Sequence, residues 1–236
     1  MVDRSGQRVK KMFGQIAPRY DFLNHFLSGG VDYLWRSAVV RKVQPKLDSE
    51  LKILDICTGT GDLAIAFWKR WKVPVVGGDF TPEMLEIGRE KLKRSGITEE
   101  QVRLIEVDAS DMPFRDGEFQ VVSVAFGLRN IESTEHGLSE MTRVCASGGQ
   151  VAVLEFSLPT FSLFRWVYLF YFRNILPKIG QFTARNQWDA YHYLPESVQE
   201  FPQGEELAEM MRQSGLSDVR YFPMTFGIAT LYIGKK

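Results

Sequence analysis

Cysteine and histidine are scarce in this chain, and neither type is clustered. The 236 residues include two cysteines and three histidines. Cys57 and Cys145 lie in apolar runs with no CxxC or histidine-rich spacing, so we expect neither a metal site nor a disulfide framework. Reduced, buried thiols in a cytoplasmic protein are the expected state of both cysteines.

An excess of charge of one sign is also missing. Lys and Arg number 29 and Asp and Glu number 29, giving a formal net charge of +0. Proteins that bind nucleic acid present strongly basic surfaces, so we expect no nucleic-acid partner. The N-terminal run MVDRSGQRVKKMFGQIA contains no continuous apolar segment and predicts neither a secretory signal nor an anchor helix. We therefore expect a cytoplasmic location.

Short aliphatic runs alternate with helical patterns from Lys52 onward. The runs are KILDIC, VPVVGGDF, VRLIEVDA, EFQVVSVAFG and QVAVLEFS, and RYFPMTFGIATLYIGKK adds two strand-like runs at the end. Helical patterns begin near Asp62, Pro82 and Ser133. This alternation predicts a doubly wound α/β fold with five parallel strands and a C-terminal strand pair.

The pattern divides one expected domain, residues 1–236, into four segments. We predict an N-terminal helical cap over 1–45, a cofactor-binding core over 46–157, an insertion over 158–203, and a helix with a strand pair over 204–236. The insertion contains FSLFRWVYLFYFRNIL, which is too short and too charged to span a bilayer, since a span needs about 20 apolar residues. It predicts a helix on a membrane surface, a groove for an apolar tail, or ordinary core or dimer-interface packing.

A glycine-rich turn follows the first predicted strand. Asp55 leads into the run CTGTGD, in which Gly59 and Gly61 let the backbone approach a ligand closely at the carboxyl end of the sheet. This predicts a nucleotide-like cofactor. The glycines and Asp79, twenty residues after Gly59, also match a dinucleotide fingerprint, so a NAD-dependent oxidoreductase is the rival hypothesis from another class.

Asp62 separates these two hypotheses. A carboxylate at a helix N-terminus repels the pyrophosphate of a dinucleotide. S-adenosylmethionine instead carries a sulfonium and an ammonium group, which Asp55 and Asp62 suit. Asp79 could accept its ribose hydroxyls, and Asp108 with Ala109 could bind its adenine. Each Asp taken alone is equally typical of a helix cap or a turn, but the three acidic strand ends together favour a methyltransferase.

Several motifs add a resemblance to a known family. DICTGTGDL, GGDFTPEML, EVDASDMPFRDGEFQVVSVAFGLRN and RVCASGGQVAVLEFS resemble the successive motifs of the quinone-biosynthesis C-methyltransferases, the UbiE/MenG (demethylmenaquinone methyltransferase) family. YDFLNHFLSGGVDYLW, YHYLPESVQEFP and GIATLYIGKK resemble it outside the core, so the resemblance covers nearly the whole chain. Two departures are Asp32, where the family signature has His, and Ala146–Ser147, where it has Lys-Pro.

The resemblance implies a Rossmann-like class I fold with a mostly parallel seven-stranded sheet and an S-adenosylmethionine-dependent enzyme. The implied reaction is C-methylation of a prenylated quinol in menaquinone or ubiquinone biosynthesis. We favour demethylmenaquinol, with 2-methoxy-6-polyprenyl-1,4-benzoquinol as the alternative substrate. The enzyme would be cytoplasmic or peripheral on the inner face of the membrane, as a monomer or a homodimer.

The resemblance also assigns residues to the cofactor. With the residues argued above, the predicted contacts are Asp55, Gly59, Thr60, Gly61, Asp79, Phe80, Asp108, Ala109 and Ala125. Ala125 stands where relatives often have Ser, so it would contribute through backbone or packing only.

The predicted catalytic residues lie after the fourth strand and in the cap. Arg129 would stabilise the developing oxyanion and Asn130 would orient the ring, at the same edge of the sheet as the cofactor. The base stays open among Asp62, Tyr20 and His192. The cap around Tyr20, which also contains Asp21 and Asn24, could exclude water from the sulfonium.

Overall fold

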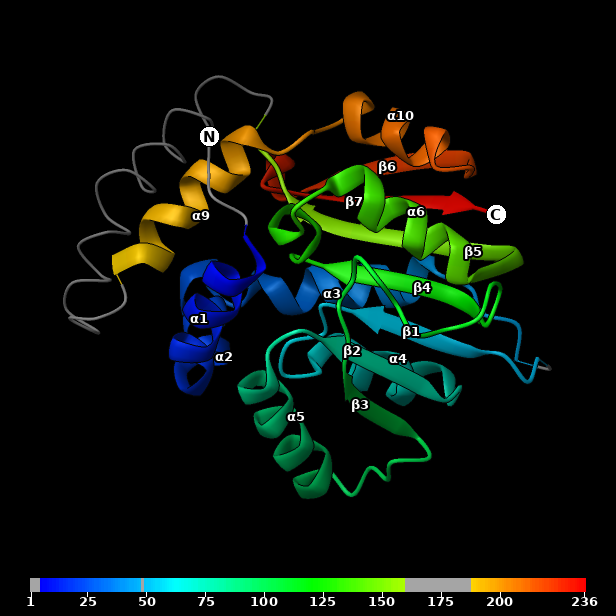
Figure 1. Cartoon of the computed structure of the whole chain (residues 1–236), viewed down its shortest axis with the longest axis horizontal. Coiled ribbons are helices and arrows are strands. Elements are labelled where there is room, and N and C mark those ends of the chain that lie inside the picture. The colour runs from blue at the N-terminus through cyan, green and yellow to red at the C-terminus, as the bar shows by residue number, and fades with distance from the viewer. Residues whose placement is uncertain (1–4, 48, 160–187) are drawn as a thin grey trace.

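The computed structural model describes residues 5–47, 49–159 and 188–236 (Figure 1). The segment 160–187, with most of the predicted aromatic insertion, lies outside the described residues. A seven-stranded sheet runs through the molecule in the order β3-β2-β1-β4-β5-β7-β6. Its strands are β1 (Lys52–Ile56), β2 (Val75–Asp79), β3 (Val102–Glu106), β4 (Phe119–Ala125), β5 (Cys145–Phe156), β6 (Ser217–Met224) and β7 (Ala229–Lys235).

The strand pairing confirms the predicted doubly wound α/β fold. β1 to β5 pair in parallel, and β7 runs antiparallel to both β5 and β6. In a parallel sheet the carboxyl ends of the strands meet at one edge, and at β1 the order of connection reverses, which opens a crevice there. The turns after β1, β2, β3 and β4 all lie at this edge (Figure 1).

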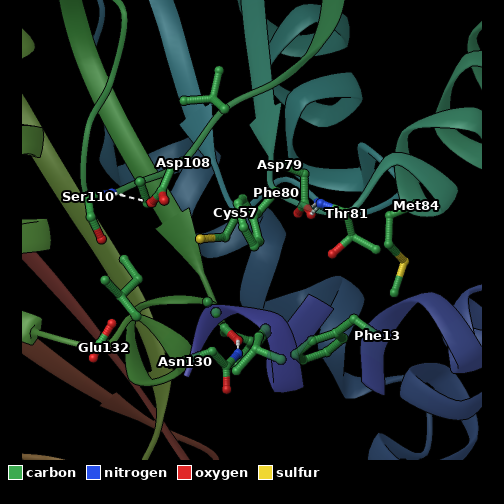
Figure 2. A pocket seen from close by; sticks show the side chains of 18 of the residues that line it. Phe13, Cys57, Asp79, Phe80, Thr81, Met84, Asp108, Ser110, Asn130 and Glu132 are labelled. Atoms are coloured by element: carbon green, nitrogen blue, oxygen red, sulfur yellow. Dashed lines mark hydrogen bonds between the residues drawn. The ribbon is translucent and has the colours of Figure 1, made fainter. Parts of the chain in front are cut away.

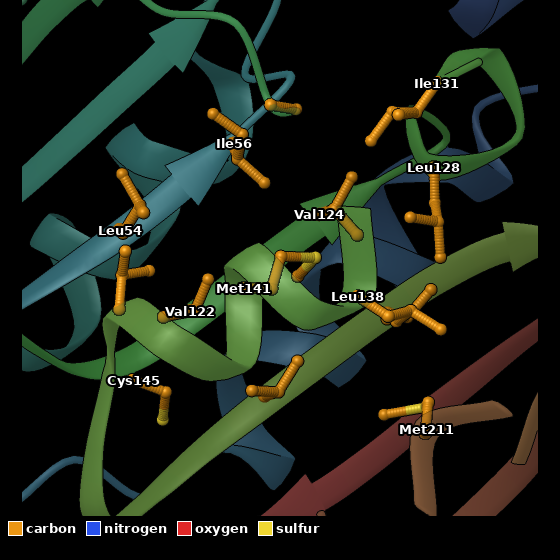
Figure 3. Packing of buried hydrophobic residues seen from close by; sticks show 14 of the residues in the cluster. Leu54, Ile56, Val122, Val124, Leu128, Ile131, Leu138, Met141, Cys145 and Met211 are labelled. Carbon is orange, nitrogen blue, oxygen red and sulfur yellow. The ribbon is translucent and has the colours of Figure 1, made fainter. Parts of the chain in front are cut away.

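Helices cover both faces of the sheet, and the strands alternate side chains between them. Leu54 and Ile56 of β1 face α6 (Thr134–Val144) and α10 (Glu205–Gln213), where they join the apolar cluster drawn in Figure 3. Ile53 of β1 belongs to the cluster on the opposite face, with α3 (Val31–Lys42), α4 (Asp62–Trp71) and α5 (Pro82–Arg94). Asp55 interrupts the otherwise apolar strand and is 1% exposed.

Local sequence signals explain where the helices begin. α5 begins with Pro82 directly after the N-cap Thr81, a position where the missing N–H of proline costs nothing. The Ser133 side chain accepts a hydrogen bond from the backbone N–H of His136 and so caps α6. α4 follows Gly61, whose φ of 82° lies in the left-handed region that favours glycine.

The predicted N-terminal cap is helical and packs beside the carboxyl edge of the sheet. It contains α1 (Gly6–Ile16), η1 (Ala17–Arg19), α2 (Tyr20–Ser28) and α3. Ile16 and Ala17 are buried against Met84 of α5, with Phe13 and Tyr20 beside them. α9 (Trp188–Glu200) lies next to α1 (Figure 1). Among the described helices none is long and apolar enough to cross a membrane.

Candidate active site

A pocket opens at the carboxyl edge of the sheet, between the strand ends and the N-terminal cap (Figure 2). Its empty volume is about 830 Å³, counting its open mouth. Four strand-end turns and the cap helices supply its walls. The lining residues are Gly6, Val9, Phe13, Tyr20, Cys57, Gly59, Asp79, Phe80, Thr81, Met84, Val107, Asp108, Ala109, Ser110, Phe126, Gly127, Asn130, Ile131 and Glu132.

The glycine turn after β1 forms the floor of this pocket. Gly59 has a φ of 57°, and a side chain placed there would come within 3.6 Å of the ring of Tyr20. That distance is an ordinary contact, so the left-handed backbone, rather than lack of space, is the reason for glycine at this position. Cys57 also lines the pocket, with a φ of 54°, and it is half-buried rather than buried as the sequence predicted. Burial raises the pKa of its thiol, so the thiol stays protonated.

Asp79 lies at the end of β2 and faces the pocket (Figure 2). One carboxylate oxygen accepts the backbone N–H of Gly59 at 2.7 Å, and the other accepts that of Thr81 at 2.9 Å. Burial raises the pKa of Asp79, and these N–H donors oppose the rise. Each carboxylate oxygen retains a further lone pair, so Asp79 can still accept hydroxyl donors from a ligand.

The turn after β3 supplies a second part of the pocket wall. Asp108 accepts the backbone N–H of Ser110 at 2.8 Å, which fixes the turn, and Ala109 is buried beside it. Phe80, next to Asp79, lines the pocket as well, with the ammonium of Lys10 4.6 Å from its ring centre. The structure thus brings together the residues that the sequence placed at the ribose and adenine.

The charge of the lining distinguishes between candidate cofactors. Asp79, Asp108 and Glu132 line the pocket, and the described lining residues include no Lys, Arg or His. Such a wall attracts a cation and repels a pyrophosphate. The residues present therefore fit the sulfonium and ammonium groups of S-adenosylmethionine and disfavour NAD.

Two predicted cofactor residues lie behind the lining. Asp55 is buried beneath the turn, where it accepts hydrogen bonds from Thr58 Oγ1 at 2.6 Å and Ser123 Oγ at 2.8 Å. Burial raises its pKa to about 6, and these two hydroxyls oppose the rise. Ala125, at the end of β4, precedes the lining residue Phe126 without lining the pocket itself.

Thr60 and Asp62 also lie outside the lining, in a polar network beside the turn. The ammonium of Lys91 lies 2.6 Å from Asp62 Oδ1 and donates to Thr60 Oγ1 at 2.8 Å. The Thr60 hydroxyl donates to Asp21 at 2.6 Å, and Arg36 lies 3.5 Å from Asp62. Gly61, between Thr60 and Asp62, is buried under Leu104 and does not line the pocket. Sequence reasoning missed Lys91 and Arg36.

Asn130 and Arg129 differ in their placement. Both belong to η2 (Leu128–Asn130), but only Asn130 lines the pocket. Asn130 Nδ2 donates to the Phe126 carbonyl at 3.3 Å, and its buried Oδ1 has no hydrogen-bond partner among the described residues. Arg129 is buried and forms an ion pair with Glu155 of β5 at 2.8 Å. Glu155 was also missed, although a carboxylate in an apolar strand is a signal for a buried partner.

The remaining candidates for the base are Tyr20 and His192. Tyr20 lines the pocket, and burial raises its pKa despite a hydrogen bond to Asn24, so Tyr20 stays a phenol at neutral pH. A phenol is a hydrogen-bond donor rather than a base. His192 belongs to α9, and its side chain lies outside those that the structure describes.

The sheet order and the cation-accepting pocket at the reversal point together define the class of the protein: a Rossmann-like class I methyltransferase. The chain belongs to the ubiE/COQ5 methyltransferase family, whose model matches residues 1–236. This membership confirms the family predicted from the motifs, the methyltransferase class of the enzyme, and S-adenosylmethionine as the expected methyl donor.

Two relatives of named function match the chain along its whole length. The ubiquinone/menaquinone biosynthesis C-methyltransferase UbiE of Geobacter sp. (strain M21) is 46% identical over 237 residues, which cover 100% of this chain and 99% of that protein. The demethylmenaquinone methyltransferase of Deinococcus radiodurans is 45% identical, with 98% and 93% covered.

Solved structures share the fold at low sequence identity. The [4+2]-cyclase SpnF superposes with a TM-score of 0.70 at 15% identity, covering 100% of this chain and 97% of that one. A phosphoethanolamine N-methyltransferase 2 of Haemonchus contortus in complex with S-adenosyl-L-methionine gives a TM-score of 0.64 at 15% identity, with 92% of this chain and 59% of that one covered. One of these neighbours is a cyclase, so the fold alone does not specify the reaction.

Proposed function

We propose that this chain transfers a methyl group from S-adenosylmethionine to a ring carbon of a prenylated quinol, with demethylmenaquinol as the substrate. The observation that carries the proposal is the pocket itself, in a chain of this family: its lining has three carboxylates and, among the described residues, no Lys, Arg or His. The names of the relatives support the quinol: both include menaquinone chemistry, and one is a demethylmenaquinone methyltransferase.

On the cofactor side, the strand ends would hold the donor. Asp79 would accept ribose hydroxyls with its remaining lone pairs, and the turn at Asp108 and Ala109 would bind the adenine. Phe80 would pack beside the bound nucleoside. When bound, S-adenosylmethionine supplies an electrophilic methyl group on a positively charged sulfur.

On the substrate side, Asn130 and Tyr20 would position the ring. Oδ1 of Asn130 needs a hydrogen-bond donor, and a quinol hydroxyl is one. A hydroxyl that donates a hydrogen bond gains phenolate character, which makes the neighbouring ring carbon more nucleophilic. Tyr20, kept protonated by burial, would donate a hydrogen bond and exclude water above Gly59.

Arg129 would act next to the ring rather than in the lining. Its charge is shared with Glu155, but Nε is buried without a hydrogen-bond partner among the described residues. Arg129 also donates to the Phe126 carbonyl, the acceptor that Asn130 uses. Arg129 would therefore orient the turn that presents Asn130, and contribute positive potential to the developing oxyanion.

We further propose that the enzyme works at the cytoplasmic surface of the membrane, because a prenylated quinol resides in the bilayer. The aromatic run of residues 161–176, which contains Arg165 and Arg173, supports this location by its sequence. Co-sedimentation of the full chain with anionic vesicles tests it, and a chain that stays in the supernatant at low salt would contradict it.

The deciding experiment supplies methyl-labelled S-adenosylmethionine with short-tailed demethylmenaquinol or the benzoquinol, under reducing conditions. We expect label on a ring carbon of the naphthoquinol, identified by mass, and about tenfold or greater loss of the reaction in Asp79→Asn. Preference for the benzoquinol would move the assignment to ubiquinone biosynthesis. Cofactor binding without transfer to either ring would refute the quinol assignment.

A further inference from the structure

Lys91, on α5, contacts three polar side chains that come from different parts of the fold. Its ammonium lies 2.7 Å from Asp21 Oδ2 of α2, 2.6 Å from Asp62 Oδ1 of α4, and 2.8 Å from Thr60 Oγ1 of the glycine turn. The contacts to Asp62 and Thr60 are hydrogen bonds, and the contact to Asp21 is an ion pair. Thr60 Oγ1 in turn donates to the second oxygen of Asp21 at 2.6 Å.

These contacts join the cap to the turn that carries the pocket. Asp21 follows Tyr20 in α2, and the Tyr20 ring lies against Gly59 and lines the pocket. Thr60 follows Gly59 in the turn. A force that holds Asp21 to Thr60 therefore also holds Tyr20 over Gly59.

The network needs the Lys91 cation to stay together. The side chains of Asp21, Asp62 and Lys91 are only 24% to 28% exposed, so water screens their charges incompletely. The second cation nearby, Arg36, lies 3.5 Å from Asp62 and also pairs with Asp32 of its own helix. Removal of Lys91 would leave the Asp21 carboxylate with the Thr60 hydroxyl and close to the Asp62 carboxylate, which repels it.

We propose that Lys91 is a positioning residue for methyl transfer: it latches α2 onto the glycine turn and so holds Tyr20 over the cofactor pocket. These contacts hold the cap against the pocket, so that the cap forms the wall opposite the strand ends. It acts through Asp21 and Thr60, without touching the cofactor. The proposal rests on the cofactor occupying this pocket, as the proposed function states.

The test compares the full chain with Lys91→Met, Asp21→Asn and the matched control Lys93→Met, an exposed lysine of the same helix. Calorimetry with S-adenosylhomocysteine gives the affinity, and amide exchange of residues 20–28 reports the closure of α2 in the free and bound protein. We expect about tenfold weaker binding and faster exchange of 20–28 in Lys91→Met and Asp21→Asn. Exchange in β1 and β4, and all properties of Lys93→Met, should stay as in the wild type.

The double variant separates the latch from a merely structural role. If Lys91 acts through Asp21, the losses in Asp21→Asn and Lys91→Met are not additive, and the double variant binds about as well as Lys91→Met alone. Lys91→Arg, which keeps the charge, should recover part of the affinity. Additive losses, or wild-type exchange of 20–28 in Lys91→Met, would overturn the proposal.

Two further results keep the test decisive. If Lys91→Met fails to fold, Asp21→Asn carries the test alone, and unchanged exchange of 20–28 in that variant refutes the latch. If the wild type binds no S-adenosylhomocysteine, the proposed function fails, while exchange of 20–28 in the free protein still decides whether Lys91 holds the cap.

Discussion

The buried carboxylate of Asp55, a candidate cofactor residue, is predicted to lower the stability of the folded protein at neutral pH. Asp55 is 1% exposed in the middle of the sheet, and burial raises its pKa to about 6. The hydroxyls of Thr58 and Ser123 oppose this rise, and the nearby charge of Asp79 adds to it. At neutral pH the folded protein therefore holds an ionised group in surroundings that disfavour ionisation.

Proton linkage gives the direction and the size of the change in the free energy of unfolding with pH. In the unfolded chain the pKa of Asp55 is 3.8, so between pH 3.8 and 6 the folded state holds the proton more tightly. The free energy of unfolding therefore falls as the pH rises through this window. Above pH 6 the ionised Asp55 lowers the free energy of unfolding by roughly 3 kcal/mol, which corresponds to the rise of its pKa from 3.8 to about 6.

Asp55→Asn removes the charge and keeps the shape. The amide can accept from Thr58, and Ser123 can turn its hydroxyl to the Leu54 carbonyl, 3.3 Å away, while accepting from the amide. Both hydroxyls stay bonded, so we expect the variant to be more stable than the wild type by roughly 1 to 3 kcal/mol at pH 8. The advantage should shrink by roughly 2 kcal/mol at pH 4.5, where the wild-type carboxyl is protonated when folded.

Urea unfolding of the cofactor-free protein at the two pH values measures this difference. The slope of the transition should be unchanged, so that a shift of the midpoint reports stability. Glu86→Gln on the exposed side of α5 is the matched control and should show no pH-dependent difference. A variant that is less stable at pH 8, or whose difference from the wild type does not change with pH, would refute the reasoning.

Four other predictions concern the pocket and its support. Asp79→Ala should weaken S-adenosylhomocysteine binding, measured by calorimetry, because it removes charge-assisted hydrogen bonds of roughly 1.5 to 3 kcal/mol each; equal affinity contradicts the ribose assignment. Asn130→Leu should lower kcat about tenfold or more with little change in cofactor affinity, since it removes the acceptor for the ring hydroxyl; a pure KM effect argues against this role. Glu155→Gln should destabilise the fold by about 3 kcal/mol in urea, because Arg129 is left as a buried unpaired cation; wild-type stability would show that the pair is dispensable. The affinity ratio of S-adenosylmethionine to S-adenosylhomocysteine should rise as the pH passes upward through about 6, because a bound sulfonium favours the ionised form of Asp55, whose pKa burial raises to about 6; a flat ratio places the sulfonium away from Asp55.

The sequence predicted the pocket wall well where a residue follows directly from the end of a strand. Asp79 and Asp108 end two neighbouring parallel strands, so topology alone brings them to one edge. Gly59 could be predicted because the turn needs a left-handed backbone. Strand ends, glycine turns and the reversal of strand order are local or topological features, so the sequence pattern predicts them.

The polar side chains that turn away from the pocket were harder to predict. Thr60 and Asp62 belong to the same motif as Gly59, yet both bind Lys91, which lies 29 residues beyond Asp62 on a helix whose charges are typical of an exposed face. Arg129 likewise depends on Glu155, on the adjacent strand. Such pairs join side chains from separate helices and strands. The periodicity of the sequence does not record which of these side chains come within bonding distance.

This division explains how one motif can do two tasks. In the turn after β1, the backbone of Gly59 faces the pocket, while the side chains of Thr60 and Asp62 face the cap. Under the proposed function the turn would need both directions, because its backbone would contact the cofactor while the side chain of Thr60 binds Asp21 of α2. Asp62, whose charge the sequence analysis set against a dinucleotide, instead lies outside the pocket lining and is paired with Lys91. The charge that disfavours a pyrophosphate in the pocket comes from Asp79, Asp108 and Glu132, which line it.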